Sequence, residues 1–192
     1  MKKKLMTVLA IVLVVALSVA GTYAYLTSQD TVTNTFTVGN IAITLDEAKV
    51  DEYGVVDASA ARVDANTYKL IPGHSYTKDP TVHFAAGSEA SYLFVEVVDQ
   101  ISAIEADTTV AAQIAANGWT KLEGVDNVYY KSVSANTGDE AVNYPVFGSF
   151  KLTDNAAVAS YAGKTITVTA YAVQADGFDT ASAAWAVAAT LK

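Results

Sequence analysis

Residues 31–38 alternate strictly between threonine and larger side chains. Threonine occupies every odd position, and the even positions hold Val32, Asn34, Phe36 and Val38. Period-two alternation with β-branched residues is typical of a strand that buries one face. This segment is therefore predicted to be a strand whose apolar face is interrupted by a single polar position.

Most of the remaining chain also favours strands. Alternating or nearly continuous apolar residues predict strands over 41–45, 81–85, 92–98, 127–131, 146–153 and 165–173. Residues 92–98 are apolar on both faces, which is typical of a central strand covered on both sides. In 81–85, Val82 and Phe84 share one face and His83 points the other way. In 146–153, the shared face is predicted to hold Val146, Phe150 and Leu152.

Two short helices are predicted between and after these strands. Asp107 or Thr108 is the expected N-cap of the first, in which Val110 and Ile114 are spaced i, i+4. Gly118 suits the position just past its end. The second helix is predicted over 179–189. Its expected N-cap is Thr180, and Trp185 is expected to pack onto the strands.

The order of these elements predicts the fold class. Residues 46–66 are acidic and weakly patterned, which indicates a loop, and Pro72 with Gly73 marks a turn. Helices do not alternate regularly with strands, so a parallel α/β sheet is excluded. Many strands with one or two short helices predict an all-β, antiparallel sandwich.

The N-terminus has the pattern of a secretory signal peptide. Three lysines follow Met1, residues 5–20 are apolar or small, and Thr22 and Ala24 are small residues spaced as a signal peptidase requires. Cleavage after Ala24 would make Tyr25 the new N-terminus. The alternative is an uncleaved membrane anchor, but the apolar run is short for a span of roughly 20 residues. We therefore predict a signal peptide over 1–24 and a single domain over 25–192.

Charge excludes one class of partner. Residues 1–24 contain three of the 12 basic residues and no acidic ones, which leaves 9 basic against 20 acidic residues, a net charge of −11. A domain this acidic is a poor ligand for nucleic acid or anionic lipid. No nucleic-acid partner is expected, and contact with a membrane is expected only through the signal peptide before cleavage.

The absence of cysteine limits the available chemistry. The chain has no cysteine, so thiolate zinc sites, cysteine nucleophiles and disulfides are all excluded. A secreted domain without disulfides depends on its hydrophobic core, and 168 residues are enough to form one.

Several stretches resemble the TasA/camelysin family. The most specific are GTYAYLTS over 21–28 and NTFTVGNI over 34–41. Later stretches with the same resemblance are the Pro-Gly pair at 72–73, KDPTV over 78–82, AYAVQ over 170–174 and AWA over 184–186. The resemblance therefore touches both ends and the centre of the chain.

The resemblance implies a fold and a mode of assembly. It implies processing by a SipW-type signal peptidase, a jelly-roll-like β-sandwich and, for the matrix members, fibres in which the N-terminal strand of one subunit adds to the sheet of the next. Residues 25–38 are then the donor segment, with Val32, Phe36 and Val38 as its apolar face. Physical chemistry agrees, because an open sheet edge has unpaired N–H and C=O groups that another strand can satisfy. The alternative is that this strand pairs within its own subunit.

Camelysin-type relatives are described as metallopeptidases, so the resemblance raises the possibility of a metal site. The histidines are His74 and His83, nine residues apart and without the helical spacing of a zinc peptidase, although Asp79 lies between them. Two acidic stretches, 46–52 and 176–179, contain oxygen ligands of the kind that calcium binds. The second lacks the full spacing of a calcium loop, so caps and turns are the preferred explanation. No catalytic residue, metal ligand or cofactor is predicted.

These patterns predict a secreted structural subunit of a cell-surface or biofilm-matrix fibre, found outside the cell or on its surface, and not an enzyme. Its expected partners are further copies of itself or related fibre subunits. Two alternatives stay open: a monomeric secreted module that binds a cell-wall or host-surface polymer, and a camelysin-like metal-dependent peptidase.

Overall fold

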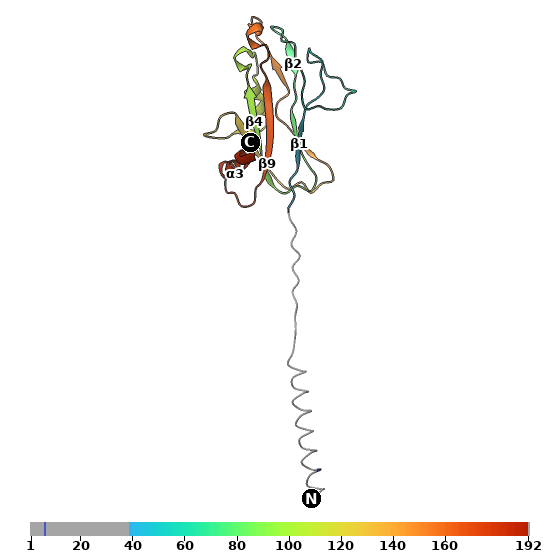
Figure 1. The fold of residues 1–192 in the computed structure, drawn as a ribbon, viewed down its shortest axis with the longest axis vertical. Coiled ribbons are helices and arrows are strands. Elements are labelled where there is room, and N and C mark those ends of the chain that lie inside the picture. The colour runs from blue at the N-terminus through green and yellow to red at the C-terminus, as the bar shows by residue number, and fades with distance from the viewer. Residues whose placement is uncertain (1–5, 7–38, 192) are drawn as a thin grey trace. The chain divides into compact units, whose positions relative to one another are not determined.

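The computed structural model describes Met6 and residues 39–191. The chain divides into two units, residues 1–38 and 39–192, and the elements named here belong to the second (Figure 1). Its strands are β1 (Ile43–Asp46), β2 (Ser75–Thr77), β3 (Thr81–Phe84), β4 (Ser91–Asp99), β5 (Thr120–Lys121), β6 (Val128–Val133), β7 (Val142–Pro145), β8 (Ser149–Lys151) and β9 (Ile166–Gln174). Its helices are α2 (Val110–Ala116) and α3 (Ala181–Ala188), with 3-10 turns η1 (Ser102–Ile104), η2 (Val158–Tyr161) and η3 (Ala189–Leu191).

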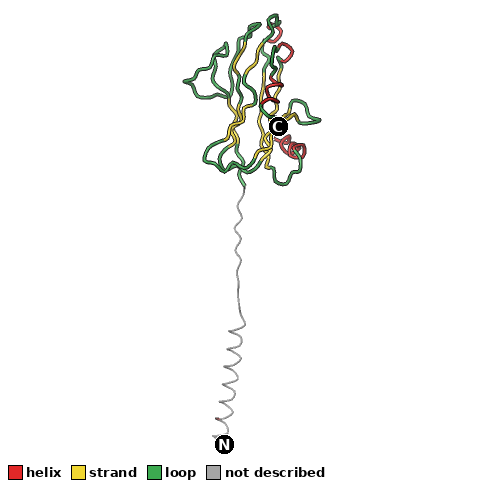
Figure 2. The backbone as a smooth tube through the Cα atoms, turned by 180° about the vertical axis from the view of Figure 1, so that it is seen from behind, coloured by secondary structure: helices red, strands yellow, loops and turns green. Residues whose placement is uncertain are grey.

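The strands form three antiparallel sheets in two layers. One layer is a four-stranded sheet in the order β5-β6-β4-β9. The other consists of a three-stranded sheet, β1-β3-β7, and the pair β2-β8. Strands and loops make up most of the described fold, and its helices are short (Figure 2). The predicted all-β sandwich with short helices is confirmed.

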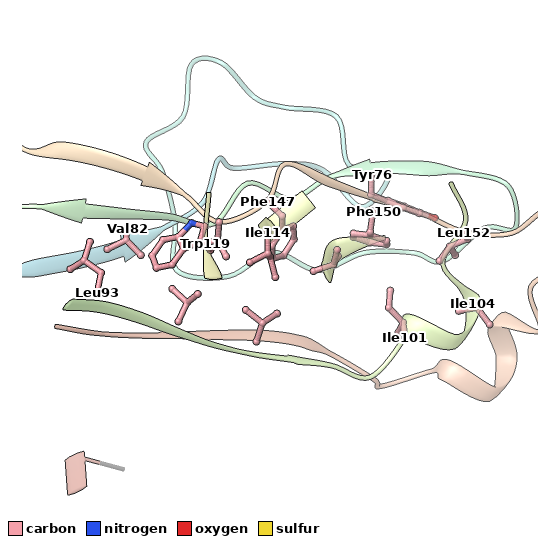
Figure 3. Close-up of a cluster of buried hydrophobic side chains, with 14 of the residues drawn as sticks. Tyr76, Val82, Leu93, Ile101, Ile104, Ile114, Trp119, Phe147, Phe150 and Leu152 are labelled. Atoms are coloured by element: carbon pink, nitrogen blue, oxygen red, sulfur yellow. The ribbon is translucent and has the colours of Figure 1, made fainter. Parts of the chain in front are cut away.

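The main core lies between the layers. Leu93, Val95 and Val97 of β4 face Val82 and Phe84 of β3, and all are buried. Figure 3 shows the remaining core side chains between the two sets of strands, and the labelled ones include Tyr76, Ile114, Trp119, Phe147, Phe150 and Leu152. The predicted faces of the β3 strand are confirmed, because His83 lies on its outer side and is only partly buried.

A second, smaller core lies on the outer face of the four-stranded sheet. Here α3 packs Trp185 against Phe94 of β4 and Tyr171 of β9, with ring centroids 5.2 and 5.5 Å apart. Since β4 has buried side chains on both faces, its prediction as a central strand is confirmed. The Thr180 side chain accepts a hydrogen bond from Ala183 N–H, which confirms that residue as the N-cap of α3.

The first predicted helix is present, with one correction. Its N-cap is Thr109, not Asp107 or Thr108, and the Thr109 side chain accepts from Ala112 N–H. Asp107 has a positive φ of 55°, which takes it out of the extended conformation that an N-cap adopts. Val110 and Ile114 are buried as predicted, and Gly118 follows the helix with φ of 78°. Among the described residues, no helix has the length and apolar character needed to cross a membrane.

The prediction of one strand over 146–153 is wrong. The chain instead forms β7 before Val146 and β8 from Ser149, and the two belong to different sheets. Gln113 holds the break between them open, since its Oε1 accepts from the N–H groups of Gly148 and Ser149. Val146, Phe150 and Leu152 are nevertheless all buried in the main core. The sequence patterns also missed β2, which follows the turn at Pro72 and Gly73.

A pair of acidic side chains lies where β4 leads into α2. Burial raises the pKa of Glu105 to about 7, the nearby Asp99 carboxylate adds to the rise, and burial also raises the pKa of Asp99. Glu105 accepts from Val110 N–H through Oε2, whereas its buried Oε1 has no partner among the described residues. The native state therefore holds a proton at Glu105 more tightly than the unfolded chain does.

We predict that Glu105→Gln stabilises the fold at neutral pH. A carboxyl group whose folded pKa is raised contributes stability that is full below its unfolded pKa, about 4.3, and is lost as pH rises through the folded pKa. The amide retains the acceptor for Val110 and carries no charge. Because Glu105 is only half-buried, the expected gain at pH 8 is about 1–2 kcal/mol, with little change at pH 4.5. Urea unfolding at both pH values measures it, and equal gains at both would contradict the explanation.

Candidate assembly groove

The residues predicted to act in processing and assembly lie outside the described residues. These are Thr22, Ala24 and Tyr25 at the predicted cleavage site, and Val32, Phe36 and Val38 on the predicted donor strand. The described residues show a surface with open strand edges.

One open edge belongs to β1. Ala85 N–H donates to Ala42 C=O over 2.9 Å, which fixes the register so that the even residues of β1 bond to β3. The N–H and C=O groups of Ile43 and Leu45 therefore point away from β3. Among the described residues no hydrogen bond reaches them, and the next pairing on that side is between Glu47 and Val63.

The second open edge belongs to β9, one of the two longest strands. Ala175 N–H donates to Ala90 C=O over 2.7 Å, so the odd residues of β9 bond to β4. The even residues turn their N–H and C=O groups outward, and within the described part of the chain these groups have no partner. They are Ile166, Val168, Ala170, Ala172 and Gln174.

A cavity lies beside these two edges. Its volume is about 960 Å³. It is lined by Leu45 of β1 and by Glu47, which follows that strand, and on the other side by Ile166 and Val168 of β9. Figure 1 shows β1 and β9 side by side, converging toward one end of the domain. We call this cavity and the two edges the groove.

The rim of the groove is apolar and only partly covered. The inward side chains of both edges pack on the main core yet remain partly exposed, namely Ile41, Ile43, Leu45, Ile166, Val168, Ala170 and Ala172. Deeper in the cavity, Tyr68 packs edge-on against Phe150 with ring centroids 5.3 Å apart. Burial raises the pKa of Tyr68, and its hydroxyl donates to Thr77 C=O over 3.0 Å. Such a surface gains free energy when an apolar segment covers it.

Polar side chains also line the cavity, among them the charged Asp64 and Lys164 and a buried ion pair at Glu47. Glu47 is 3% exposed, and its Oε2 contacts Lys78 Nζ at 2.5 Å. Its Oε1 accepts from Asn66 Nδ2 over 2.9 Å. All three residues line the cavity. The carboxylate is thus paired on both oxygens, as a buried charge must be.

Two of the other sheet edges, β7 and β5, are protected. At the outer edge of β7, Pro145 occupies a position whose N–H would point away from β3, so no donor is exposed there. β5, at the far edge of the four-stranded sheet, has only two residues. Proline and short length are both common means of preventing strand addition at an edge. Neither is found at β1 or β9.

The histidines are held by separate partners. His74 Nε2 lies 2.9 Å from Tyr53 C=O, whereas His83 Nε2 lies 2.8 Å from Asp46 Oδ1. Asp79 accepts from Arg62 and from Ala48 N–H, so its oxygens are in use. Within residues 39–191 no three side chains of histidine, cysteine, aspartate or glutamate are grouped to hold a metal ion.

His83 belongs to a charged network on the outer face of the β1-β3-β7 sheet. Burial lowers its pKa, but hydrogen bonds to Asp46 and Asn143 outweigh this, and the net pKa is raised. Burial likewise raises the pKa of Asp46, but hydrogen bonds from Arg62 and His83 outweigh it, and the net pKa is lowered. The network joins β1, β3 and β7 to the 47–66 loop through Arg62.

Residues 1–58 match the family described as camelysin metallo-endopeptidase. This match supports the TasA/camelysin resemblance over the N-terminal part of the chain, where the most specific motifs lie. Both histidines lie outside the matched residues. No curated protein and no solved structure matches the chain.

We predict that the His83–Asp46 pair makes stability fall above neutral pH. A histidine whose folded pKa is raised contributes stability that is full below about pH 6.5 and is lost as pH rises through the folded pKa. The pair is partly exposed, so the expected loss between pH 6 and pH 8.5 is about 0.5–1 kcal/mol. Chemical unfolding at both pH values measures it.

The control for this prediction is His83→Gln. The variant keeps a hydrogen-bonding side chain but carries no titrating charge, so its unfolding free energy should lack that part of the slope. An unchanged slope in the variant would assign the pH dependence to other groups.

Proposed function

We propose that this chain is an exported structural subunit of a cell-surface or matrix fibre, without a catalytic role. In this proposal residues 31–38 of one copy add as a strand to the groove of the next. The observation that carries it is the pair of unpaired strand edges, β1 and β9, which lie beside a cavity and have partly exposed apolar side chains.

The two parts of the chain complement each other. The groove lacks hydrogen-bond partners for the outward backbone groups of β9 and a cover for its apolar rim, as far as the described residues extend. Residues 31–38 supply an extended backbone with Val32, Phe36 and Val38 on one face. Addition of a strand to an open edge satisfies both needs, since main-chain bonds provide affinity and alternate side chains provide specificity.

Donation between copies leads to a polymer. The donor segment and the groove are different surfaces, so each copy can give a strand to one neighbour and receive one from another. A heterologous contact of this kind continues into a filament unless the rotation closes a ring. Pairing of the strand within its own subunit would give a monomer instead.

Export is part of the proposal. The signal-peptide pattern and the match over residues 1–58 support processing by a SipW-type signal peptidase, with cleavage after Ala24. The mature subunit would then act outside the cell or on its surface, with further copies or related subunits as partners.

The name of the matched family favours a second candidate, a metal-dependent peptidase. Against it, the match does not extend to His74 or His83, and both side chains are hydrogen-bonded elsewhere. Chelator-sensitive cleavage of casein that is lost in His74→Ala and His83→Ala would favour this candidate over the fibre subunit.

We predict that Phe36→Asp prevents fibre formation by the chain that begins at Tyr25. The change places a charge on the face that would enter the groove, where burial of an unpaired carboxylate is costly. Thr35→Asp is the matched control, because the neighbouring position lies on the opposite face. Electron microscopy and sedimentation should show fibres for the starting chain and for Thr35→Asp. Their absence for Phe36→Asp and for a chain that begins at Asn40 is the expected result, and fibres from either would contradict strand donation.

We further predict that Val168→Pro blocks assembly without unfolding the subunit. The Val168 N–H points to the open edge of β9, so its loss removes no bond from the β4–β9 ladder. Lys121→Pro is the matched control, since Lys121 N–H also points outward, at the opposite edge of the same sheet. Circular dichroism should report folded protein for both variants, with at least a tenfold loss of polymer for Val168→Pro only. Equal polymer from the two variants would exclude the β9 edge.

A further inference from the structure

The ion pair in the groove is incompletely bonded. Lys78 Nζ carries three hydrogens, and among the described residues its hydrogen-bond acceptor is Glu47 Oε2. Each carboxylate oxygen of Glu47 can accept a further hydrogen bond beyond those from Lys78 and Asn66. The Asn66 amide is already occupied by Glu47, Ala48 C=O and Val50 N–H. The buried ion pair therefore offers one donor and one acceptor close together in the cavity.

The donor segment has one side chain that matches this pair. Along the face formed by the even residues of 31–38, Asn34 is the single polar position between Val32 and Phe36. A carboxamide is neutral and has both an acceptor oxygen and a donor nitrogen. It can accept from Lys78 and donate to Glu47 at once, without adding charge to a buried site.

We propose that Asn34 of one copy hydrogen-bonds to Lys78 and Glu47 of the neighbouring copy and so sets the register of the donated strand. This inference rests on the proposed function and adds to it a residue that determines specificity. The partner is a second copy of this chain, because both halves of the contact are in its own sequence.

A polar contact is needed because apolar residues alone fix the register weakly. A strand keeps the same face inward when it slips by two residues, about 6.6 Å. Val32, Phe36 and Val38 could each fill an apolar space after such a slip. The slip would place an apolar side chain over Lys78. It would also move Asn34 away from the ion pair, so that polar groups lose their partners on both sides.

The test compares four chains that begin at Tyr25: the starting chain, Asn34→Leu, the double variant Glu47→Gln with Lys78→Met, and all three changes together. Leucine is close in shape to asparagine but cannot hydrogen-bond. The double variant removes the charges and keeps an acceptor for Asn66. The critical concentration for polymer, from sedimentation, is the readout, and circular dichroism confirms that each chain is folded.

We expect Asn34→Leu to raise the critical concentration about tenfold in the native groove, as for one buried hydrogen-bonding group left unpaired. In the Glu47→Gln, Lys78→Met background, Asn34→Leu should change it less than about threefold. Thr33→Val, an isosteric change on the outward face, should change it less than about twofold.

The outcomes separate this inference from the proposed function. Fibres that assemble equally well with and without the Asn34→Leu change, in both backgrounds, would overturn the register contact and leave strand donation intact. An equal loss in both backgrounds would also overturn it, because Asn34 would then act independently of the ion pair. If the starting chain forms no fibres, the proposed function itself is contradicted.

Discussion

The groove and the proposed assembly depend on one constraint, namely that the β-sandwich has strand edges without a partner strand. β1 and β9 each have one side without strand partners among the described residues, and the core side chains beneath them are only partly covered. Water can satisfy the open backbone groups, so the subunit is able to fold with this edge exposed. The apolar rim gains nothing from water, and covering it yields roughly 25 cal/mol for each Å². An extended segment with an alternating apolar face satisfies both requirements.

The groove is kept open by packing around it. Tyr76 and Phe150 stack with centroids 4.7 Å apart, and Tyr68 packs edge-on against both. The Asn66 side chain ties its loop to the backbone of Ala48 and Val50. These contacts hold the 64–70 loop beside the cavity, so that it lines the space without filling it. A preformed site lowers the ordering cost of binding.

Sequence patterns predicted the buried faces of the strands better than the breaks, the helix cap and the open edges. Alternation located β1, β3 and β9, and a nearly continuous apolar run located β4, because in each of these strands one face, or both, is buried in a core. Interruption by hydrogen bonds to a distant side chain leaves no sequence pattern, so alternation predicts one strand over 146–153, where Gln113 holds the chain open. The helix cap was misplaced because Asp107 has a positive φ and the cap falls two residues later, at Thr109. The groove itself could not be predicted, because alternation reports which face of a strand is buried but not whether its edge has a partner. The outward backbone groups of β9 follow only from its register with β4.

A charged pair in an apolar groove is better explained by specificity than by stability. Burying Glu47 and Lys78 costs solvation, and replacing such a pair with apolar residues is often neutral or stabilising. A wholly apolar groove would accept any extended apolar segment, including exposed edges of unrelated chains. The ion pair imposes a penalty on every segment that cannot hydrogen-bond at that point. Residues 25–192 carry a net charge of −11, and like charges repel, so selection of this kind has to come from short-range contacts.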